Sequence, residues 1–192
     1  PPKGEVGAVA RSTINLSDFD RAERYHGGHV TANLFRVLGV APLIGREFSD
    51  ADSKSGAAPT AMLSYSLWQS RYGGDRSIVG RTIRVDGQPA TVIGVMPDGF
   101  TYPRNEDLWV PSTTIADRVP VDPFAYWVIA RRHADASDAD LAAAFDRWFA
   151  DAARADPERF RGRSFRVEPL ARMAADRTTL GTLGSMLAAV AM

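Results

Sequence analysis

The chain has 192 residues, of which 45% are hydrophobic and 24% charged, and its 23 basic residues equal its 23 acidic ones. These values are typical of a folded protein with one domain or two small lobes, and they exclude a disordered chain. With no net charge there is no long-range field to attract a phosphate backbone, so we expect no nucleic-acid partner. The sequence has no cysteine, which excludes disulfides and thiolate metal sites.

The first third predicts extended structure, a short helix and a loop. Residues 6–16 mix β-branched and polar residues and predict a strand. Gly27-Gly28 predicts a turn before a second extended run at 29–31. A short helix is expected over 33–38, because its apolar residues share one face and Gly39 stands at the C-cap position. The polar run 49–59 predicts a surface loop.

The middle third predicts a strand, a helix and a hairpin. Residues 60–63 fit a short buried strand, and Ser64 fits the N-cap of a helix that stops at Gly73-Gly74. Residues 81–96 form two β-rich runs around Asp86-Gly87, a dipeptide that accepts the positive φ angles of a tight hairpin turn. Residues 108–110 predict one more short strand.

The last third predicts a β-α-β unit. Residues 124–131 and 165–170 are expected as strands, and Ser137 begins a helix with apolar residues at helical spacing. This unit needs a neighbouring strand from the first third or from another chain. The uncharged run 180–192 is shorter than the about 20 residues that cross a bilayer. It fits either the first half of a spanning helix or an amphipathic terminal helix.

The histidines and the acidic loop do not meet the requirements of a metal site. His26 and His29 flank two glycines, with no carboxylate or cysteine at a ligand-like spacing. His133 follows two arginines and is expected to be solvated. Residues 50–56 begin like a calcium loop, but Lys54 stands where a third oxygen ligand belongs. We therefore predict no metal ligands.

Catalytic and cofactor patterns are also missing. Ser64 lies outside the glycine context of a nucleophile elbow, and the glycine patterns lack the phosphate-loop and dinucleotide spacings. Glu106 with Asp107, or Asp146 with Asp151, would form an acid–base pair only if the fold brought them together. We predict no catalytic or cofactor-binding residue. The larger aromatic residues are expected in the core: Trp68, Trp109, Trp127, Phe145 and Trp148.

The middle of the chain carries a series of ordered motifs, the longest of which is NLFRVLGVAPLIGREF at 33–48. The others follow in register: APTAMLSYSLW at 58–68, RYGGD at 71–75, VGR at 79–81, DGQP at 86–89, VIGVMPDGF at 92–100 and LWVP at 108–111. This series resembles the MacB-like periplasmic core domain of ABC transporter permeases, closest to the duplicated orphan permeases common in acidobacteria. The resemblance is close over residues 25–112 and loose elsewhere, and residues 1–24 and 113–123 match poorly.

The resemblance implies an α+β fold with two lobes. Residues 1–47 and 113–176 would form a porter-like β-α-β lobe, and residues 48–112 an inserted mixed α/β lobe that contains the hairpin. Residues 177–192 would be the start of a second transmembrane helix or its linker. The chain begins with Pro1 and has no signal-peptide pattern, which indicates a fragment of a larger membrane protein. Gly45, Pro59, Pro111 and Pro123 stand at the crossings between the lobes, where each is either a hinge or, as the more common case, ordinary loop punctuation.

The implied function is that of a non-catalytic extracytoplasmic domain of an export permease at the periplasmic face of the bacterial inner membrane. Such a domain transmits conformational change and binds a partner or a substrate. Its implied partners are the permease's own transmembrane helices, a cytoplasmic ATPase acting indirectly, a periplasmic adaptor protein, and a second copy in the full transporter. Two alternatives stay open. A substrate- or lipoprotein-binding module predicts an apolar cleft, and a periplasmic hydrolase predicts converging titratable groups.

Overall fold

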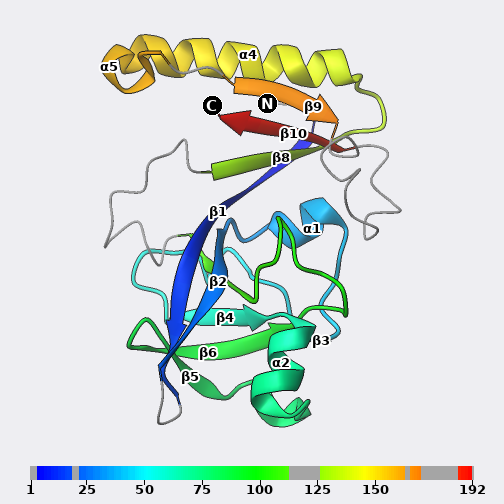
Figure 1. The fold of residues 1–192 in the computed structure, drawn as a ribbon. Helices are drawn as coiled ribbons and strands as arrows, with labels where there is room; N and C mark the ends of the chain where they lie inside the picture. The colour runs from blue at the N-terminus through cyan, green and yellow to red at the C-terminus, as the bar shows by residue number, and fades with distance from the viewer. Residues whose placement is uncertain (1–3, 19–21, 113–125, 163–164, 170–185, 192) are drawn as a thin grey trace. The chain divides into compact units, whose positions relative to one another are not determined.

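A computed structural model describes residues 4–18, 22–112, 126–162, 165–169 and 186–191 (Figure 1). The fold is α+β, as expected. Its strands are β1 (Gly4–Leu16), β2 (Glu23–Val30), β3 (Ile44–Gly45), β4 (Thr60–Leu63), β5 (Thr82–Val85), β6 (Gln88–Val95), β7 (Leu108–Pro111), β8 (Tyr126–Arg132), β9 (Phe165–Pro169) and β10 (Met186–Ala191). The helices are α1 (Leu34–Leu38), α2 (Tyr65–Tyr72), the 3₁₀ turn η1 (Arg76–Ile78), α4 (Asp138–Ala155) and α5 (Pro157–Phe160).

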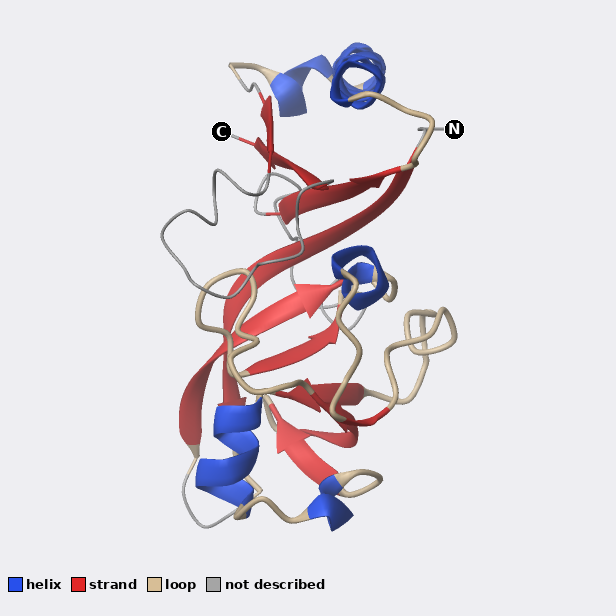
Figure 2. Ribbon diagram, turned by 90° about the vertical axis from the view of Figure 1, so that its right-hand side faces the viewer, coloured by secondary structure: helices blue, strands red, loops and turns tan. Residues whose placement is uncertain are grey.

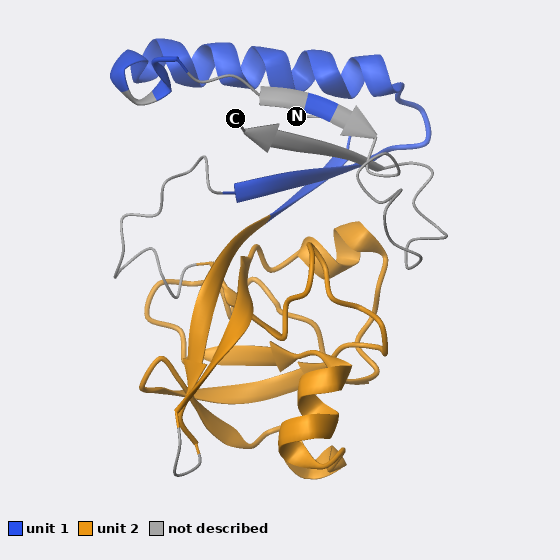
Figure 3. Ribbon diagram, viewed as in Figure 1, with its two compact units in different colours: residues 1–8, 123–192 blue, residues 9–122 orange. Residues whose placement is uncertain are grey.

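The chain divides into two compact units (Figure 3). Unit 1 combines residues 1–8 with 123–192, and unit 2 is residues 9–122. One unit combines both ends of the chain and the other is an internal stretch, and their bounds differ from those expected at 47/48 and 112/113. Residues 9–47 group with the middle of the chain because β2 pairs with β7 and Phe35 packs against Trp109. Gly45 and Pro111, two of the candidate hinges, therefore lie inside unit 2.

The strands of unit 2 close into a ring. Starting from β1, each strand pairs with the next in the order β1, β2, β7, β4, β6, β5, and β5 returns to β1. The closing contact is short: Leu16 is opposite Val85, and the Ser17 N–H donates to the Arg84 carbonyl at 3.1 Å. A closed ring leaves few unpaired strand edges. Figure 2 shows how far strands dominate this unit.

Two apolar clusters fill unit 2. Inside the ring, alternate residues of each strand point inward, as Ile83 and Val85 do on β5, and they pack with Ile14 and Leu16. Outside the ring, Phe35 of α1 lies 5.7 Å from Trp109 and 5.8 Å from Phe100 between ring centroids. Both of these pairs are edge-to-face, an arrangement that adds to the gain from burial.

The glycine pair at 27 and 28 is not a turn, which corrects the sequence-based expectation. Both residues lie inside strand β2. A Cβ atom on Gly27 would stand 2.3 Å from Ile14 Cδ1, and one on Gly28 would stand 2.6 Å from Trp109 Cδ1. The glycines are there because neighbouring side chains occupy the space that a Cβ would need.

The other local predictions in unit 2 agree with the structure. Helix α1 ends at Gly39 with φ 70°, and α2 starts at Ser64, whose hydroxyl accepts the Leu67 N–H, and ends at Gly73 with φ 63°. The β5–β6 hairpin turns at Asp86-Gly87, with φ angles of 48° and 77°. These signals are local, so the chain needs no distant contact to obey them.

Unit 1 contains the expected strand–helix–strand series β8, α4 and β9. Helix α4 runs along one face of its sheet (Figure 1) and begins with a capping box formed by Ser137 and Asp140. Leu141 and Phe145 of α4 pack against Ala130 of β8 and against Val6 of β1. The neighbour that the β-α-β unit needs is the first part of β1, which lies next to β8 in the strand order.

The end of the chain differs from the expected helix. Residues 186–191 form strand β10, which pairs antiparallel with β8 on one side and β9 on the other. This position satisfies the strand's backbone groups on both edges, whereas a helix would leave β8 and β9 apart. The rest of the expected segment, 177–185 and 192, lies outside the described residues, as do Pro123, Phe124 and Leu170. Within the described part of the chain, no helix has both the length and the apolar character needed to span a membrane.

Candidate functional site

Strand β1 and the two residues after it make polar contacts to several parts of unit 2. Its residues from 11 onward alternate between the inside and the outside of the ring, with Ile14 and Leu16 fully buried. Side chains or backbone groups at positions 11, 12, 15 and 18 bond to four separate parts of unit 2. We call these contacts the β1 anchors.

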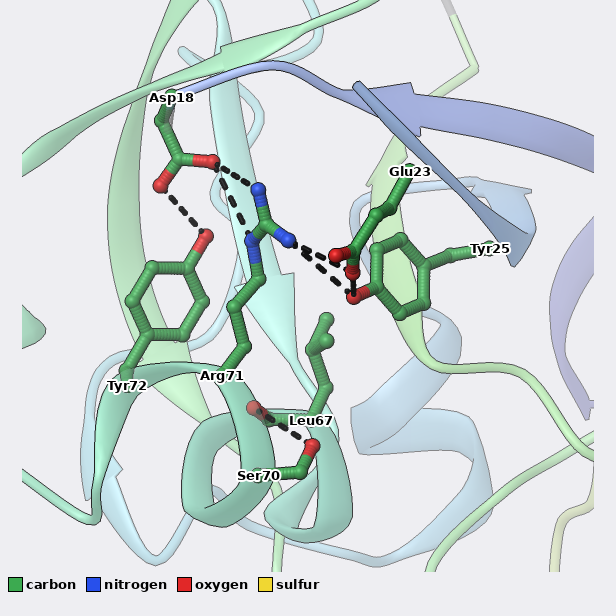
Figure 4. A network of polar contacts seen from close by, with 7 residues as sticks. All are labelled: Asp18, Glu23, Tyr25, Leu67, Ser70, Arg71 and Tyr72. Carbon is green, nitrogen blue, oxygen red and sulfur yellow. Dashed lines mark hydrogen bonds and ion pairs between the residues drawn. The ribbon is translucent and has the colours of Figure 1, made fainter. Parts of the chain in front are cut away.

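The strongest anchor joins the residue after β1 to helix α2 (Figure 4). The Arg71 guanidinium donates to Asp18 Oδ1 from Nη2 at 2.8 Å and from Nε at 3.3 Å. Its Nη1 donates to Glu23 Oε2 at 2.8 Å, and the Tyr72 hydroxyl donates to Asp18 Oδ2 at 3.0 Å. Tyr25 completes the group, since its hydroxyl donates to Glu23 and accepts from Arg71 Nη1 at 3.3 Å. We call these five residues the Arg71 network.

The centre of the Arg71 network is shielded from water, while the Glu23 side chain at its edge is half-exposed. The side chains of Arg71 and Asp18 are 6% and 7% exposed. Burial by itself would lower the pKa of Arg71, but hydrogen bonds to Asp18 and Tyr25 outweigh it and raise that pKa. Burial, reinforced by the Asp18 carboxylate, raises the pKa of Tyr72, which therefore stays a hydroxyl donor at neutral pH. Opposite charges and donors fixed in this way hold α2 and the end of β1 at a constant distance.

A second anchor ties Arg11 of β1 to residues 104–106. Arg11 Nε donates to Glu106 Oε1, and its Nη2 donates to Asn105 Oδ1 at 3.3 Å. Glu106 is 1% exposed and also accepts the Arg104 N–H at 2.7 Å. A buried carboxylate requires compensation of this kind, so removing Arg11 would leave the Glu106 side chain with only part of its hydrogen bonding.

The remaining anchors lie at positions 12 and 15. The Asp86 carboxylate in the hairpin turn accepts the Asn15 N–H at 2.8 Å and the Asn15 Nδ2 at 3.1 Å. Ser12 Oγ lies 2.7 Å from His29 Nε2 of β2. His29 is 4% exposed, and burial lowers its pKa to about 4. Its Nδ1 has no hydrogen-bond partner in the described part of the chain, which favours the neutral ring.

The structure separates the side chains of His26 and His29 and holds the acidic loop through an ion pair. His26 and His29 are three residues apart on one strand, so their side chains project from opposite faces. His133 is exposed, as expected. Asp52 pairs with Arg46 at 2.7 Å and accepts the Ser49 N–H, and the hydrogen bond from Arg46 holds the pKa of Asp52 well below its usual range.

The paired carboxylates do not converge. Glu106 turns to Arg11, while Asp107 accepts the His26 N–H at 3.0 Å. Asp146 and Asp151 are both exposed on α4, and Asp151 pairs with Arg154. In the described ranges, no group of three or more His, Cys, Asp and Glu side chains is arranged to hold a metal ion.

One aromatic residue contradicts the expectation that all lie in the core. Trp148 of α4 is 62% exposed. The helix instead packs through Leu141, Phe145 and Phe149, spaced four residues apart, and the Phe149 ring stacks edge-on against Phe160 of α5 at 5.3 Å. The apolar stripe seen in the sequence is thus wider than the surface that covers it.

The β1 anchors were missed by sequence reasoning. Arg71 lies in a quoted motif, but its partner Asp18 is 53 residues away, and Arg11 and Glu106 are 95 residues apart. No local pattern marks such pairs. The one available signal is an isolated charged residue inside or beside a β-rich run, as Arg11 and Asp18 are.

Comparison with known proteins places these features in a family. The family model described as "MacB-like periplasmic core domain" matches residues 4–147. Over 88 residues, 44% of this chain, the sequence is 32% identical to the macrolide export ATP-binding/permease protein MacB of Burkholderia cenocepacia (strain HI2424). An equal match is found to the protein of that name in Burkholderia orbicola (strain AU 1054), and the matched region spans 13% of the length of each relative.

Solved structures show the same fold at low sequence identity. The periplasmic region of MacB from Actinobacillus actinomycetemcomitans matches with a TM-score of 0.61 and 15% identity, covering 79% of this chain and 66% of that one. The extracellular domain of the noncanonic ABC-type transporter YknZ from Gram-positive bacteria matches with a TM-score of 0.56 and 18% identity, covering 98% and 80%.

Proposed function

Because the chain belongs to the MacB-like periplasmic core domain family, we propose that it is the extracytoplasmic domain of an ABC-type permease. In this proposal it passes conformational change between the permease's membrane helices and an extracytoplasmic partner or substrate, and it makes or breaks no covalent bonds itself. The family match over residues 4–147 is the observation that carries the proposal.

The two-unit organisation supports this role. Both ends of the chain belong to unit 1, and unit 2 is a single internal stretch. If membrane helices flank the domain, both connect to unit 1, so motion of those helices enters the domain there. Unit 2, closed on itself and held by long-range ion pairs, would respond as one body.

The partners follow from the same proposal. The relatives' name joins ATP-binding and permease functions, which supports a cytoplasmic ATPase as the energy source. An extracytoplasmic adaptor and a second copy of the permease are the further partners that we propose, and the cargo is a molecule exported from the cell.

The proposal can be tested by measuring distances between the units during the ATPase cycle. The chain lacks cysteine, so Arg154→Cys on α4 and Asp50→Cys in unit 2, both exposed, provide two spin-label sites in this chain, to be introduced into a permease whose other parts carry no cysteine. In the full permease, reconstituted with its ATPase, the distance distribution should shift between the nucleotide-free and the ATP-bound state.

A hydrolysis-deficient ATPase held in the ATP state should give the shifted distribution, and ADP alone should not. Two labels inside unit 2, at Asp50→Cys and Arg84→Cys, provide the control and should keep one distribution throughout. Identical distributions between the units in all nucleotide states would contradict the proposed transmission.

A further inference from the structure

We propose that strand β1 is the element through which displacement passes between the two units, and that the Arg71 network holds its far end. This inference deepens the proposed function and depends on it for its biological meaning. It is a statement about the mechanics of the chain, however, and the isolated chain can test it.

Strand β1 is continuous across the boundary between the two units. It is one strand of 13 residues, Gly4–Leu16, of which residues 4–8 belong to unit 1 and residues 9–16 to unit 2 (Figure 3). In unit 1 it lies beside β8 so closely that a Cβ on Gly4 would stand 2.6 Å from the Arg131 carbonyl oxygen. In unit 2 it pairs with β2 residue by residue, from Val9 opposite Val30 to Leu16 opposite Glu23.

A paired strand resists both compression and sliding along its axis, and in this sense β1 acts as a rod. Its rise of about 3.3 Å per residue leaves little room for compression. Sliding by one residue would turn every side chain to the other face. Ile14 and Leu16, both 0% exposed inside the ring, would then exchange places with the exposed Thr13 and Asn15. The apolar ring interior forbids that slip for residues 9–16, so a pull on residues 4–8 is passed along the continuous strand to the ring.

Side chains or backbone groups at residues 11, 15 and 18 fix β1 and its end to unit 2. Arg11 bonds to the 104–106 segment, Asn15 to the hairpin turn at Asp86, and Asp18 to Arg71 of α2. Three elements of unit 2 that are distant in sequence therefore hold one strand. The buried Arg71–Asp18 pair is the terminal anchor, since it follows the last residue of β1. A pull on β1 thus reaches the whole ring instead of peeling the β1–β2 hairpin from it.

Hydrogen exchange of the 192-residue chain tests the inference. Arg71→Met removes the terminal anchor and keeps most of the side chain's length. We expect amide exchange to rise about tenfold over residues 10–16 and about threefold or more over residues 5–8 and in β8, because local opening spreads along a cooperative unit. Exchange in α4, which is not paired with β1, should stay within about twofold of the parent chain.

Arg46→Met provides the matched control. It breaks another Arg–Asp pair of unit 2, between Arg46 and Asp52, that has no link to β1, and its effect should stay within residues 46–54. An effect of Arg71→Met confined to unit 2 would overturn the inference. So would an equal rise in α4, because that pattern marks unfolding of the whole chain.

Two further variants keep the test decisive. Asp18→Asn weakens the same anchor more gently and should give the same pattern at smaller amplitude, even if Arg71→Met unfolds the chain. Insertion of Gly-Gly between Ala8 and Val9 preserves the two-residue side-chain period but interrupts the rod. In this background Asp18→Asn should no longer change exchange at residues 5–8, and a persisting change there would contradict the role of β1. None of these measurements requires a transporter, so they can fail while the proposed function stands.

Discussion

The Arg71 Nη2 atom lies 2.8 Å from Asp18 Oδ1, which joins the last turn of α2 to the chain just beyond β1. Both side chains are nearly fully buried, and the Tyr72 hydroxyl supplies a further hydrogen bond to the same carboxylate. A buried pair of this kind is costly to break from one side, because the remaining charge is left without compensation.

A double-mutant cycle should show strong coupling between these two residues. Arg71→Met alone should lower the free energy of unfolding by about 2–4 kcal/mol, and Asp18→Asn by about 1–3 kcal/mol. The double variant should lose less than the sum, with a coupling of about 1–3 kcal/mol. Urea denaturation followed by circular dichroism measures all four proteins.

The surface pair Arg46–Asp52 serves as the comparison for this cycle. Arg46 is 54% exposed, so Arg46→Met should cost less than about 1 kcal/mol. Equal losses for the two arginine variants would mean that burial adds nothing to the Arg71 network.

Loss of one hydroxyl tests the hydrogen bond from Tyr72 to Asp18 Oδ2. Tyr72→Phe keeps the ring in its buried position but removes the donor to Asp18 Oδ2, so we expect a loss of about 1 kcal/mol in unfolding free energy. Tyr65→Phe on the same helix is the matched control, because the Tyr65 ring is only partly buried and packs against Trp68. If the two variants unfold at the same urea concentration, the Tyr72 hydroxyl contributes nothing to stability.

The buried ring of His29 should make stability depend on pH. Its pKa in the folded chain is about 4, lowered by burial from 6.5. The folded state therefore disfavours the protonated ring, and the stabilisation is complete above pH 6.5 and is lost as pH falls towards 4. The difference between the two values corresponds to about 3 kcal/mol.

His29→Gln should reduce this dependence, since the glutamine amide can replace Nε2 beside Ser12 and does not titrate. Denaturation midpoints compared between pH 7 and pH 4.5 provide the measurement. Parallel pH profiles for the parent chain and the variant would show that other groups carry the acid sensitivity.

Close packing explains Gly27 and predicts a coupled pair of substitutions. Gly27→Ala should destabilise the chain by about 1–3 kcal/mol, because the new methyl group meets the Ile14 side chain. Ile14→Ala alone should cost about 2–5 kcal/mol by opening a cavity in the ring. The double variant should lose clearly less than the sum, because the methyl group enters the vacated space. Additive losses would rule out the steric explanation.

Much of the local structure could be predicted from the sequence because its signals act over a few residues. The Ser64 and Ser137 caps, the glycine that ends α1 and the Asp86-Gly87 turn are all observed where they were predicted. The β-α-β series was also predicted, since its apolar spacing is that of a helix between two extended runs. The ordered motifs over 33–111 identified the family, and the family match over 4–147 confirms it.

The arrangement of these elements could be decided only in three dimensions. Gly27 and Gly28 resemble a turn in the sequence, but Ile14 and Trp109 place them inside a strand. The run 186–191 has no polar residue, so no apolar–polar pattern in the sequence tells a helix from a strand. Pairing with β8 and β9 makes it a strand. Trp148 shares the spacing of core residues but remains exposed.

The β1 anchors depend most fully on the tertiary structure. The sequence by itself determined the caps and turns, and its ordered motifs resemble those of the MacB-like domain family, because all of these signals lie in neighbouring residues. The pairs Arg71–Asp18 and Arg11–Glu106 connect residues 53 and 95 positions apart. Closure of the ring brings them together, since a contact between distant residues leaves no periodic mark in the sequence.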